Sequence, residues 1–468
     1  MKQIVTIIIA TLIATSCTVY QKYTRPEIAT DNLYGAIECS DTVTIADISW
    51  REFFTDTHLQ ALIEQALVSN ADMQIAAQRV VESTATLRSA KLSFFPSFSF
   101  DPSYNLNAPL NSSLSHSYTL PINASWAIDI NGATLNSKRS AQSAYEQSHL
   151  YRQSVQTALV SAVANSYYTL LMLDAQLAVS RTTAESWREN VRIMKAMKLA
   201  GMANEASVSQ TEANSWEIEA SLHNLEYNIL QAENALALLL GTTPQKFSRG
   251  SIYEQTFSQS LSVGIPAQLL SRRADVRSAE RTLQQAYYAT NIAEGAFIPS
   301  LTLSGSFGWQ DQLGKAVASP GSWIVSFAAR LATDIFNAGK KRANLAIARA
   351  RQEQAMISFR HTLLTAGNEV NNALAKCQTA RSKTDARQKQ IAALESAVNS
   401  TQALMRHSES TYLEVLTAQQ KLLNAQLSQI ADKFEEIQGT INLYSALGGG
   451  VDHNEDISTL PKRERRKK

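Results

Sequence analysis

The stretch SFSFDPSYNLNA, residues 97–108, alternates between two kinds of side chain. Serine, aspartate and asparagine alternate with a set of mainly apolar residues. An alternation with a period of two is typical of a β-strand that has water on one face and an apolar environment on the other. Pro102 belongs to the apolar face and cannot donate a hydrogen bond, so we expect the strand pairing to be interrupted there. The other residues of the apolar face are Phe98, Phe100, Tyr104, Leu106 and Ala108.

Three further stretches alternate in the same way, at residues 115–129, 299–309 and 322–335. Each is about as long as a tilted membrane-spanning strand, near ten residues. A half-buried sheet on a soluble core would show the same alternation. The strands form two hairpins, however, each flanked by long helical stretches, and this favours the membrane interpretation. Aromatic residues near the strand ends suit interfacial girdles; they are Tyr104, Trp126, Trp309 and Trp323.

The two halves of the chain resemble each other. AFIPSLTLSGSFGW (296–309) matches SFFPSFSFDPSYNL (93–106), and SESTYLEVLTAQQ (408–420) aligns with GMANEASVSQTEA (201–213). Such self-similarity indicates an internal repeat. We expect each half to contain a helix, two strands, a long helix, a turn and a return helix.

The predicted organisation follows this repeat. A signal peptide at 1–16 and a lipid-anchored segment at 17–50 come first. The first repeat has its helical start at 51–93, a β-hairpin at 94–129, and a long helix with its return helix at 132–241. After an equatorial linker at 242–265, the second repeat has its helical start at 266–296, a β-hairpin at 297–336, and a long helix with its return helix at 339–447, followed by a tail at 448–468.

The long helices are predicted from the absence of breakers. Neither glycine nor proline intervenes between Gly132 and Gly201, so one helix there would be roughly 100 Å long. Its apolar and small residues follow the alternating four-three spacing of a coiled-coil seam. Gly201 and Ser408 mark the expected tips of the two helical hairpins. The seam residues are Leu159, Val163, Ser166, Leu170, Leu173, Leu177, Ser180, Ala184, Trp187, Val191 and Met194.

The N-terminus reads as a secretory signal. Lys2 precedes the apolar run IVTIIIATLIA, which is too short to span a bilayer as a stable anchor. The run ends in ATSC, and the small residue before Cys17 is typical of a lipoprotein signal whose cysteine becomes lipidated. The alternative is a plain signal peptide with an incidental cysteine. No disulfide is expected between Cys39 and Cys377, and no later run of 18 apolar residues suggests a transmembrane helix.

Four strands cannot close a membrane barrel, since the smallest need about eight. An open strand edge in lipid is not tolerated, because each unpaired backbone group costs several kcal/mol there. Several copies of the chain must therefore share one barrel. Two, three or four copies would satisfy this requirement.

Over nearly its full length the chain resembles the TolC-like outer membrane factors, and most closely their lipoprotein (NodT- and OprM-like) branch. The resemblance is carried by YTRPE after Cys17, by GIPAQLLSRRADVRSAERTLQQAYYATNIAEGAFIPSLTLSGSFG, by TYLEVLTAQQ and by LYSALGGG. It implies a mainly α fold with membrane β-strands. A long α-helical coiled-coil barrel would be joined to a shared transmembrane β-barrel, with four strands per chain and twelve in a trimer.

The resemblance also implies a function and its residues. The chain would be the passive outer-membrane channel of a tripartite efflux system, with a periplasmic adaptor, an inner-membrane pump (most often of the RND type) and outer-membrane lipid as partners. Gly201 and Ser408 would contact the adaptor at the tips. Leu413 matches a leucine that forms a constriction in relatives, and Thr417 stands where many have aspartate. The implied periplasmic gate is Tyr412, Leu413, Glu414 and Thr417.

Other classes are less well supported. One alternative is the outer-membrane duct of a type I protein secretion system; another is a structural coiled-coil lipoprotein without a lumen. The seven histidines show no metal-ligand spacing, so neither catalysis, a metal nor a cofactor is expected. A net charge of +2 gives no indication of nucleic-acid binding.

Two charged clusters allow two interpretations each. Arg272, Arg273, Asp275 and Glu280 are interpreted as a helix start with ion pairs rather than a site. The basic residues before the first tip read as a solvated face or, alternatively, as a docking surface for the adaptor. These are Arg188, Arg192, Lys195 and Lys198.

Overall fold

The protein is represented by a computed structural model that describes residues 19–28, 33, 44–107, 115–255, 257, 268–312, 323–406 and 412–450. The chain divides into two units. The first contains residues 1–28, 78–150 and 277–362, and the second contains residues 29–77, 151–276 and 363–468. Cys17, Cys39, Ser408 and the expected signal peptide lie outside the described residues, as does residue 451 onward of the expected tail.

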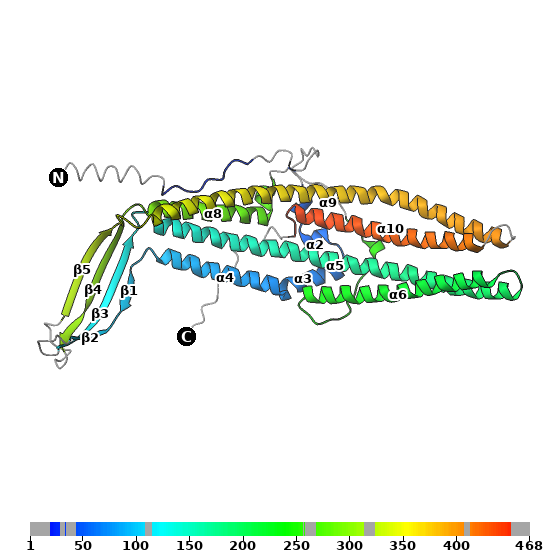
Figure 1. Cartoon of the computed structure of the whole chain (residues 1–468), viewed down its shortest axis with the longest axis horizontal. Helices are drawn as coiled ribbons and strands as arrows, with labels where there is room; N and C mark the ends of the chain where they lie inside the picture. Colours follow the sequence, from blue (N-terminus) through cyan, green and yellow to red (C-terminus); the bar gives the residue numbers. More distant parts are fainter. Residues whose placement is uncertain are drawn as a thin grey trace. The chain divides into compact units, whose positions relative to one another are not determined.

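The internal repeat is confirmed by helices of matching length (Figure 1). The helices α4 (Ala71–Leu92) and α8 (Ala274–Gly295) each contain 22 residues. The long helices α5 (Ala133–Leu199) and α9 (Lys340–Arg406) each contain 67 residues, and the return helices α6 (Glu205–Leu239) and α10 (Tyr412–Ala446) each contain 35. The shorter helical elements are η1 (Ile45–Asp47), α2 (Trp50–Phe53), α3 (Thr57–Ser69), η2 (Ile252–Glu254) and α7 (Leu269–Arg272).

The first unit contains one antiparallel sheet. Its strands are β1 (Ser97–Phe100), β2 (Ser103–Asn107), β3 (Ser115–Ile128), β4 (Ser300–Gln312) and β5 (Trp323–Ala332). Both β1 and β2 pair with β3, β3 pairs with β4, and β4 pairs with β5. One edge of the sheet is therefore β5, and the other is formed by β1 and β2 in succession, called here the β1–β2 line. The expected interruption at Pro102 is present, because the line breaks at Asp101 and Pro102.

The two faces of this sheet differ in polarity. One cross-strand row consists of Phe100, Ile122, Phe307 and Val325, and the neighbouring row consists of Ser99, Asn123, Ser306 and Ser326. The hydroxyl oxygens of Ser306 and Ser326 are 2.7 Å apart. Successive residues of a strand point to opposite faces, so the rows define one apolar and one polar face. The large apolar side chains at positions 98–106 are exposed in the single chain, with Phe98 at 71% and Leu106 at 56%.

The second unit has an aromatic core where short elements meet the end of α10. The rings of Phe53 and Tyr444 stack at a centroid distance of 4.0 Å, and Trp50 and Phe54 are fully buried. The Tyr444 hydroxyl donates a hydrogen bond to the Ile48 carbonyl at 2.7 Å. These contacts attach the segment before α3 to the last helix of the chain.

The predicted coiled-coil seam of α5 is largely correct. Nine of its eleven residues are buried, whereas Ser166 and Val191 are partly exposed. Cys377 is a buried free thiol in α9. No helix among the described residues is long and apolar enough to cross a membrane.

Candidate functional site

The first tip is a tight turn between α5 and α6. Gly201 has a φ of 78°, and the Met202 N–H donates to the Met197 carbonyl at 2.8 Å. A residue with positive φ commonly ends a helix, and glycine adopts it without steric cost. The side chain of Asn204 caps α6 by accepting a hydrogen bond from the Ser207 N–H at 2.9 Å. The predicted tip residue Gly201 is therefore at the turn; its predicted counterpart Ser408 is not among the described residues.

Basic residues of α5 pair with acidic residues of α6 along this hairpin. The pairs Arg181–Glu226, Arg188–Glu219 and Lys195–Glu212 have N–O distances of 2.9, 2.6 and 2.6 Å. Their members are seven residues apart on each helix, which is the coiled-coil repeat. Lys198 pairs with Glu205, and Arg192 pairs with Glu189 on its own helix. The four basic side chains before the tip are exposed, as the interpretation of a solvated face predicts, but each also has a carboxylate partner.

The second hairpin is paired differently. Arg381–Glu436 and Arg387–Asp432 join α9 and α10 at 3.4 and 2.9 Å, and Lys383 reaches Glu435 at 2.9 Å. In the described structure, residues 388–405 of α9 form no ion pair with α10. Ion pairs therefore hold the second hairpin together in its half remote from the tip.

The start of α10 packs against the first hairpin. A buried cluster joins α5, α6 and α10, and its members are Leu177, Ala184, Trp187, Ile218, Leu222, Leu416 and Leu423. Next to it, the Asn190 side-chain amide donates to the Gln419 side-chain oxygen at 2.9 Å. This hydrogen bond joins residues 229 positions apart, from the two halves of the repeat.

The predicted gate residues whose side chains are described are exposed, unlike the α10 residues of this cluster. Leu413 is 64% exposed, and Glu414 and Thr417 are exposed as well. The Thr417 hydroxyl donates to the Leu413 carbonyl at 2.8 Å, one helical turn away. Leu413 and Thr417 are not buried seam residues within this chain, since Val415 and Leu416 take the buried positions. Tyr412 begins α10, and its side chain is not described.

Two arginines fasten the ends of the hairpins that are remote from the tips. The guanidinium of Arg249 donates two hydrogen bonds to the carboxylate of Asp174 in α5. It also forms an ion pair with the buried carboxylate of Glu233 in α6, at an N–O distance of 2.6 Å. These carboxylates raise the pKa of the Arg249 guanidinium, chiefly through the hydrogen bonds to Asp174. One side chain from the linker after α6 thus ties both helices of the first hairpin together.

Arg273 has the same role in the second hairpin. It donates to the Ala446 carbonyl of α10 at 2.9 Å and pairs with Glu369 of α9 at 2.6 Å and with Asp275 of α8 at 2.5 Å. Arg272 pairs with Asp47 at 2.8 Å. The cluster interpreted from the sequence as a helix start is thus structural, but its ion pairs connect separate elements.

The first unit holds the N-terminal strap, residues 19–28. Arg25 forms two hydrogen bonds with the buried Glu280 of α8, at 2.6 and 2.7 Å. Arg139 of α5 donates to the Tyr20 carbonyl at 3.0 Å. Burial, followed by the Glu280 charge, raises the pKa of Tyr23 to about 12. Sequence reasoning missed this strap, as it missed Asn190 and Arg249.

The comparisons with known proteins agree with this architecture. A family model described as outer membrane efflux protein matches residues 62–242 and 265–449. The chain belongs to the outer membrane efflux protein family. Its members are channel proteins, and this chain accordingly has the fold and function of an outer-membrane efflux channel.

Individual relatives cover almost the whole efflux channel. The cation efflux system protein CusC of Escherichia coli is 29% identical, over 94% of this chain and 97% of CusC. The toluene efflux pump outer membrane protein TtgC of Pseudomonas putida is 27% identical over 96% of each chain. A crystal structure of CusC superimposes with a TM-score of 0.83, at 27% identity, over 92% of this chain and 99% of that one.

Proposed function

We propose that three copies of this chain form one passive duct, with the four strand positions of each sheet contributing to a shared twelve-stranded barrel. The observation that carries the proposal is the sheet, which has an apolar face, a polar face and two open edges. Lipid would contact the apolar face and water the polar face. Closure by further copies would pair the edges, because unpaired backbone groups are too costly in lipid.

Reconstitution in planar bilayers tests the duct. The purified protein should form pores of low conductance in the absence of partners, because the helical end is closed at rest. A protein that is extracted from cells without detergent, or that forms no pores although it is correctly folded, would contradict the proposal.

The gate of this duct is assigned to the start of α10. Leu413, Glu414 and Thr417 lie on its exposed side and would meet their counterparts from the other two copies, with Tyr412 at the same helix start. Leu413 and Thr417 would narrow the aperture without adding charge, and Glu414 would contribute one carboxylate from each copy. Such constrictions restrict ions by size and by poor hydration.

Partners would bind at the tips. The turn at Gly201 and the corresponding segment near Ser408 are assigned to contact with a periplasmic adaptor, which would connect the duct to an inner-membrane pump. CusC and TtgC are named for different cargoes, cations and toluene, although this chain resembles them to a similar extent. The cargo therefore depends on the pump and adaptor, and co-purification of the pump from cells would identify it.

Cys17 is assigned as the lipidation site. It directly precedes the N-terminal strap, whose contacts with α5 and α8 hold the start of the mature chain against the helices. Metabolic labelling with a fatty acid should label the wild type and not Cys17→Ser. Equal labelling of both proteins would contradict the assignment.

A further inference from the structure

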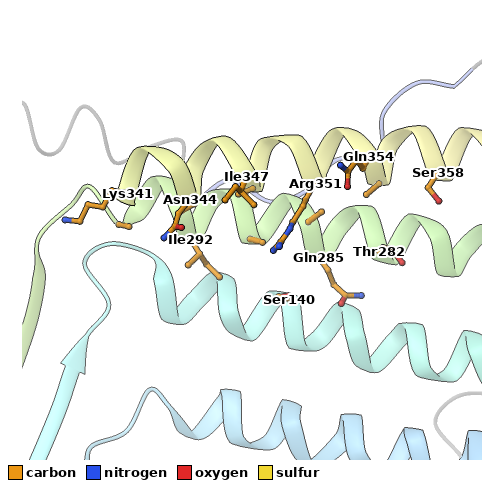
Figure 2. Close-up of a pocket in the computed structure, with 16 residues that line it drawn as sticks. Ser140, Thr282, Gln285, Ile292, Lys341, Asn344, Ile347, Arg351, Gln354 and Ser358 are labelled. Atoms are coloured by element: carbon orange, nitrogen blue, oxygen red, sulfur yellow. The ribbon is translucent and has the colours of Figure 1, made fainter. Parts of the chain in front are cut away.

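A groove of about 920 Å³ lies in the first unit between α8, the first part of α9 and Ser140 of α5 (Figure 2). Alanines line much of it, and a surface of small apolar side chains leaves room for an apolar ligand. The volume is in the usual range for small-molecule sites. The apolar floor is formed by Ala286, Ala289, Ile292, Ala293, Ile347 and Ala348.

Two cations line the same groove. The Lys341 ammonium nitrogen is 3.6 Å from a carboxylate oxygen of Asp334, so part of its charge is compensated. Arg351 forms no hydrogen bond or ion pair with the described part of the chain, and its side chain extends from α9 toward α8 in Figure 2. An apolar floor beneath an uncompensated guanidinium is complementary to a molecule with an apolar body and one anionic group.

The groove and the N-terminal strap occupy opposite faces of α8. Glu280 and Tyr287 face the strap, which they contact through Arg25 and Tyr23. Ala289, two residues beyond Tyr287, lines the groove. Each residue advances an α-helix by about 100°, so these two positions are separated by roughly half a turn.

This opposition indicates which side of the duct the groove faces. The placement of the strap rests on the proposed function. Because acyl chains on Cys17 must reach lipid, the strap that follows Cys17 lies on the outer surface of the duct. The opposite face of α8 then borders the water-filled interior. A groove on that face is accessible to molecules that pass through the duct.

We propose that this groove is a binding site for anionic amphiphiles on the inner wall of the duct. The apolar body of the ligand lies along the alanines of α8, and its anionic group pairs with Arg351. The site would retain such molecules briefly below the sheet during their passage, and it would favour them over neutral molecules of the same shape.

Photolabelling tests the site in the full-length trimer in nanodiscs of zwitterionic lipid. The probes are an alkyl sulfonate that carries a diazirine and the alcohol with the same chain, and the labelled residues are mapped by mass spectrometry. Labels on the apolar face of the sheet serve as the internal reference. In the wild type, the sulfonate should label α8 and α9 at the groove more strongly than the alcohol does.

Three variants define the outcome. Arg351→Gln should lower groove labelling by the sulfonate about tenfold, as expected for loss of a charge-assisted hydrogen bond, and leave labelling by the alcohol unchanged. Ala289→Leu should lower labelling by both probes, because it fills the floor. Arg349→Gln is the matched control, since Arg349 is on the same helix but pairs with Glu294 at 3.0 Å and does not line the groove.

Two results would overturn the proposal. One is equal labelling of the groove by the two probes, or no labelling by the sulfonate, which would show that the anionic group is not recognised. The other is an equal loss of labelling in Arg349→Gln and Arg351→Gln, which would show that only the general charge of α9 matters. Conductance of the same purified proteins in planar bilayers reports separately on the duct, so failure of the site and failure of the proposed function are distinguishable.

Discussion

At the scale of single residues, closure of the proposed gate would depend on what the exposed side of α10 presents. Leu413→Ala should raise single-channel conductance by about twofold or more, because three bulky apolar side chains leave the aperture. Thr417→Arg should also loosen the closed end, since it creates a ring of like charges. Leu238→Ala is the control, as Leu238 is 78% exposed on α6 and distant in sequence from the tips. Unchanged conductance in assembled Leu413→Ala protein would exclude Leu413 from the constriction.

Asn190 and Gln419 offer a second test at this scale. Their hydrogen bond is the contact that links α5 to α10 beside the buried cluster. Asn190→Ala leaves the half-buried Gln419 amide without this partner, at a cost of about 1 kcal/mol to the closed state. The open probability in bilayers should rise about fivefold. Asn165→Ala is the control, because the one bond of the Asn165 amide within the described residues is to the Ser161 carbonyl of its own helix. A double variant with Gln419→Ala should add little, whereas full additivity would mean that the pair is not coupled.

At the scale of elements, the ion pairs that recur every seven residues between α5 and α6 should make the first hairpin sensitive to charge reversal. Arg188→Glu replaces the ion pair between Arg188 and Glu219 with two neighbouring carboxylates. The expected loss is about 0.5–1 kcal/mol in the free energy of unfolding at low salt, and less at high salt, since the pair is exposed. The double reversal Arg188→Glu with Glu219→Arg should restore the wild-type value in thermal unfolding. A double variant as unstable as the single one would argue against pairing.

The Arg273 cluster makes the second hairpin sensitive to acid. Burial opposes the ionisation of Asp275, but the hydrogen bonds and charge of Arg273 outweigh it and hold the pKa of Asp275 below its ordinary value. This contribution to stability is complete above the unfolded pKa of about 3.9 and is lost as the pH falls through the lower folded value. Asp275→Asn should therefore flatten the fall in melting temperature below about pH 4. Asp385→Asn should not, because Asp385 is exposed and its partner in the described structure is Lys389 on its own helix.

The elements themselves could be predicted from local pattern, whereas their connections could not. The period-two alternation gives the strands, and the run between Gly132 and Gly201 gives α5, because each pattern is complete within one segment. Arg249 bonds to Asp174 and Glu233, which are 75 and 16 positions away in the sequence. The hydrogen bond of Asn190 joins residues that are 229 positions apart. Such pairs depend on how the elements pack. The ion pairs of the first hairpin were predictable in part, since lysine and arginine recur every seven residues on α5 and glutamate does so on α6.

At the scale of the whole molecule, the sheet determines the assembly. Its edges, β5 and the β1–β2 line, are the places where further copies would add strands. A long exposed strand edge is an aggregation hazard in water, and in lipid it is not tolerated. The same sheet is exposed on its apolar face, where Phe98, Phe100 and Phe327 are each more than 60% accessible. Assembly and membrane insertion therefore depend on one structural element.

Two adjacent residues of the edge strand β5 allow the predicted environments of the two sheet faces to be compared in one experiment. Phe327 is 76% exposed on the apolar face of β5, and Ser326 bonds Ser306 on the polar face. Phe327→Lys should reduce the amount of trimer in the outer-membrane fraction, because a lysine facing lipid costs about 2–4 kcal/mol at mid-membrane depth. Ser326→Lys changes the charge equally but places it in water, so it should leave trimer abundance nearly unchanged on unheated gels. Equal loss in both variants would mean that the two faces do not differ in their contact with lipid, and a loss confined to Ser326→Lys would reverse the assignment of the two faces.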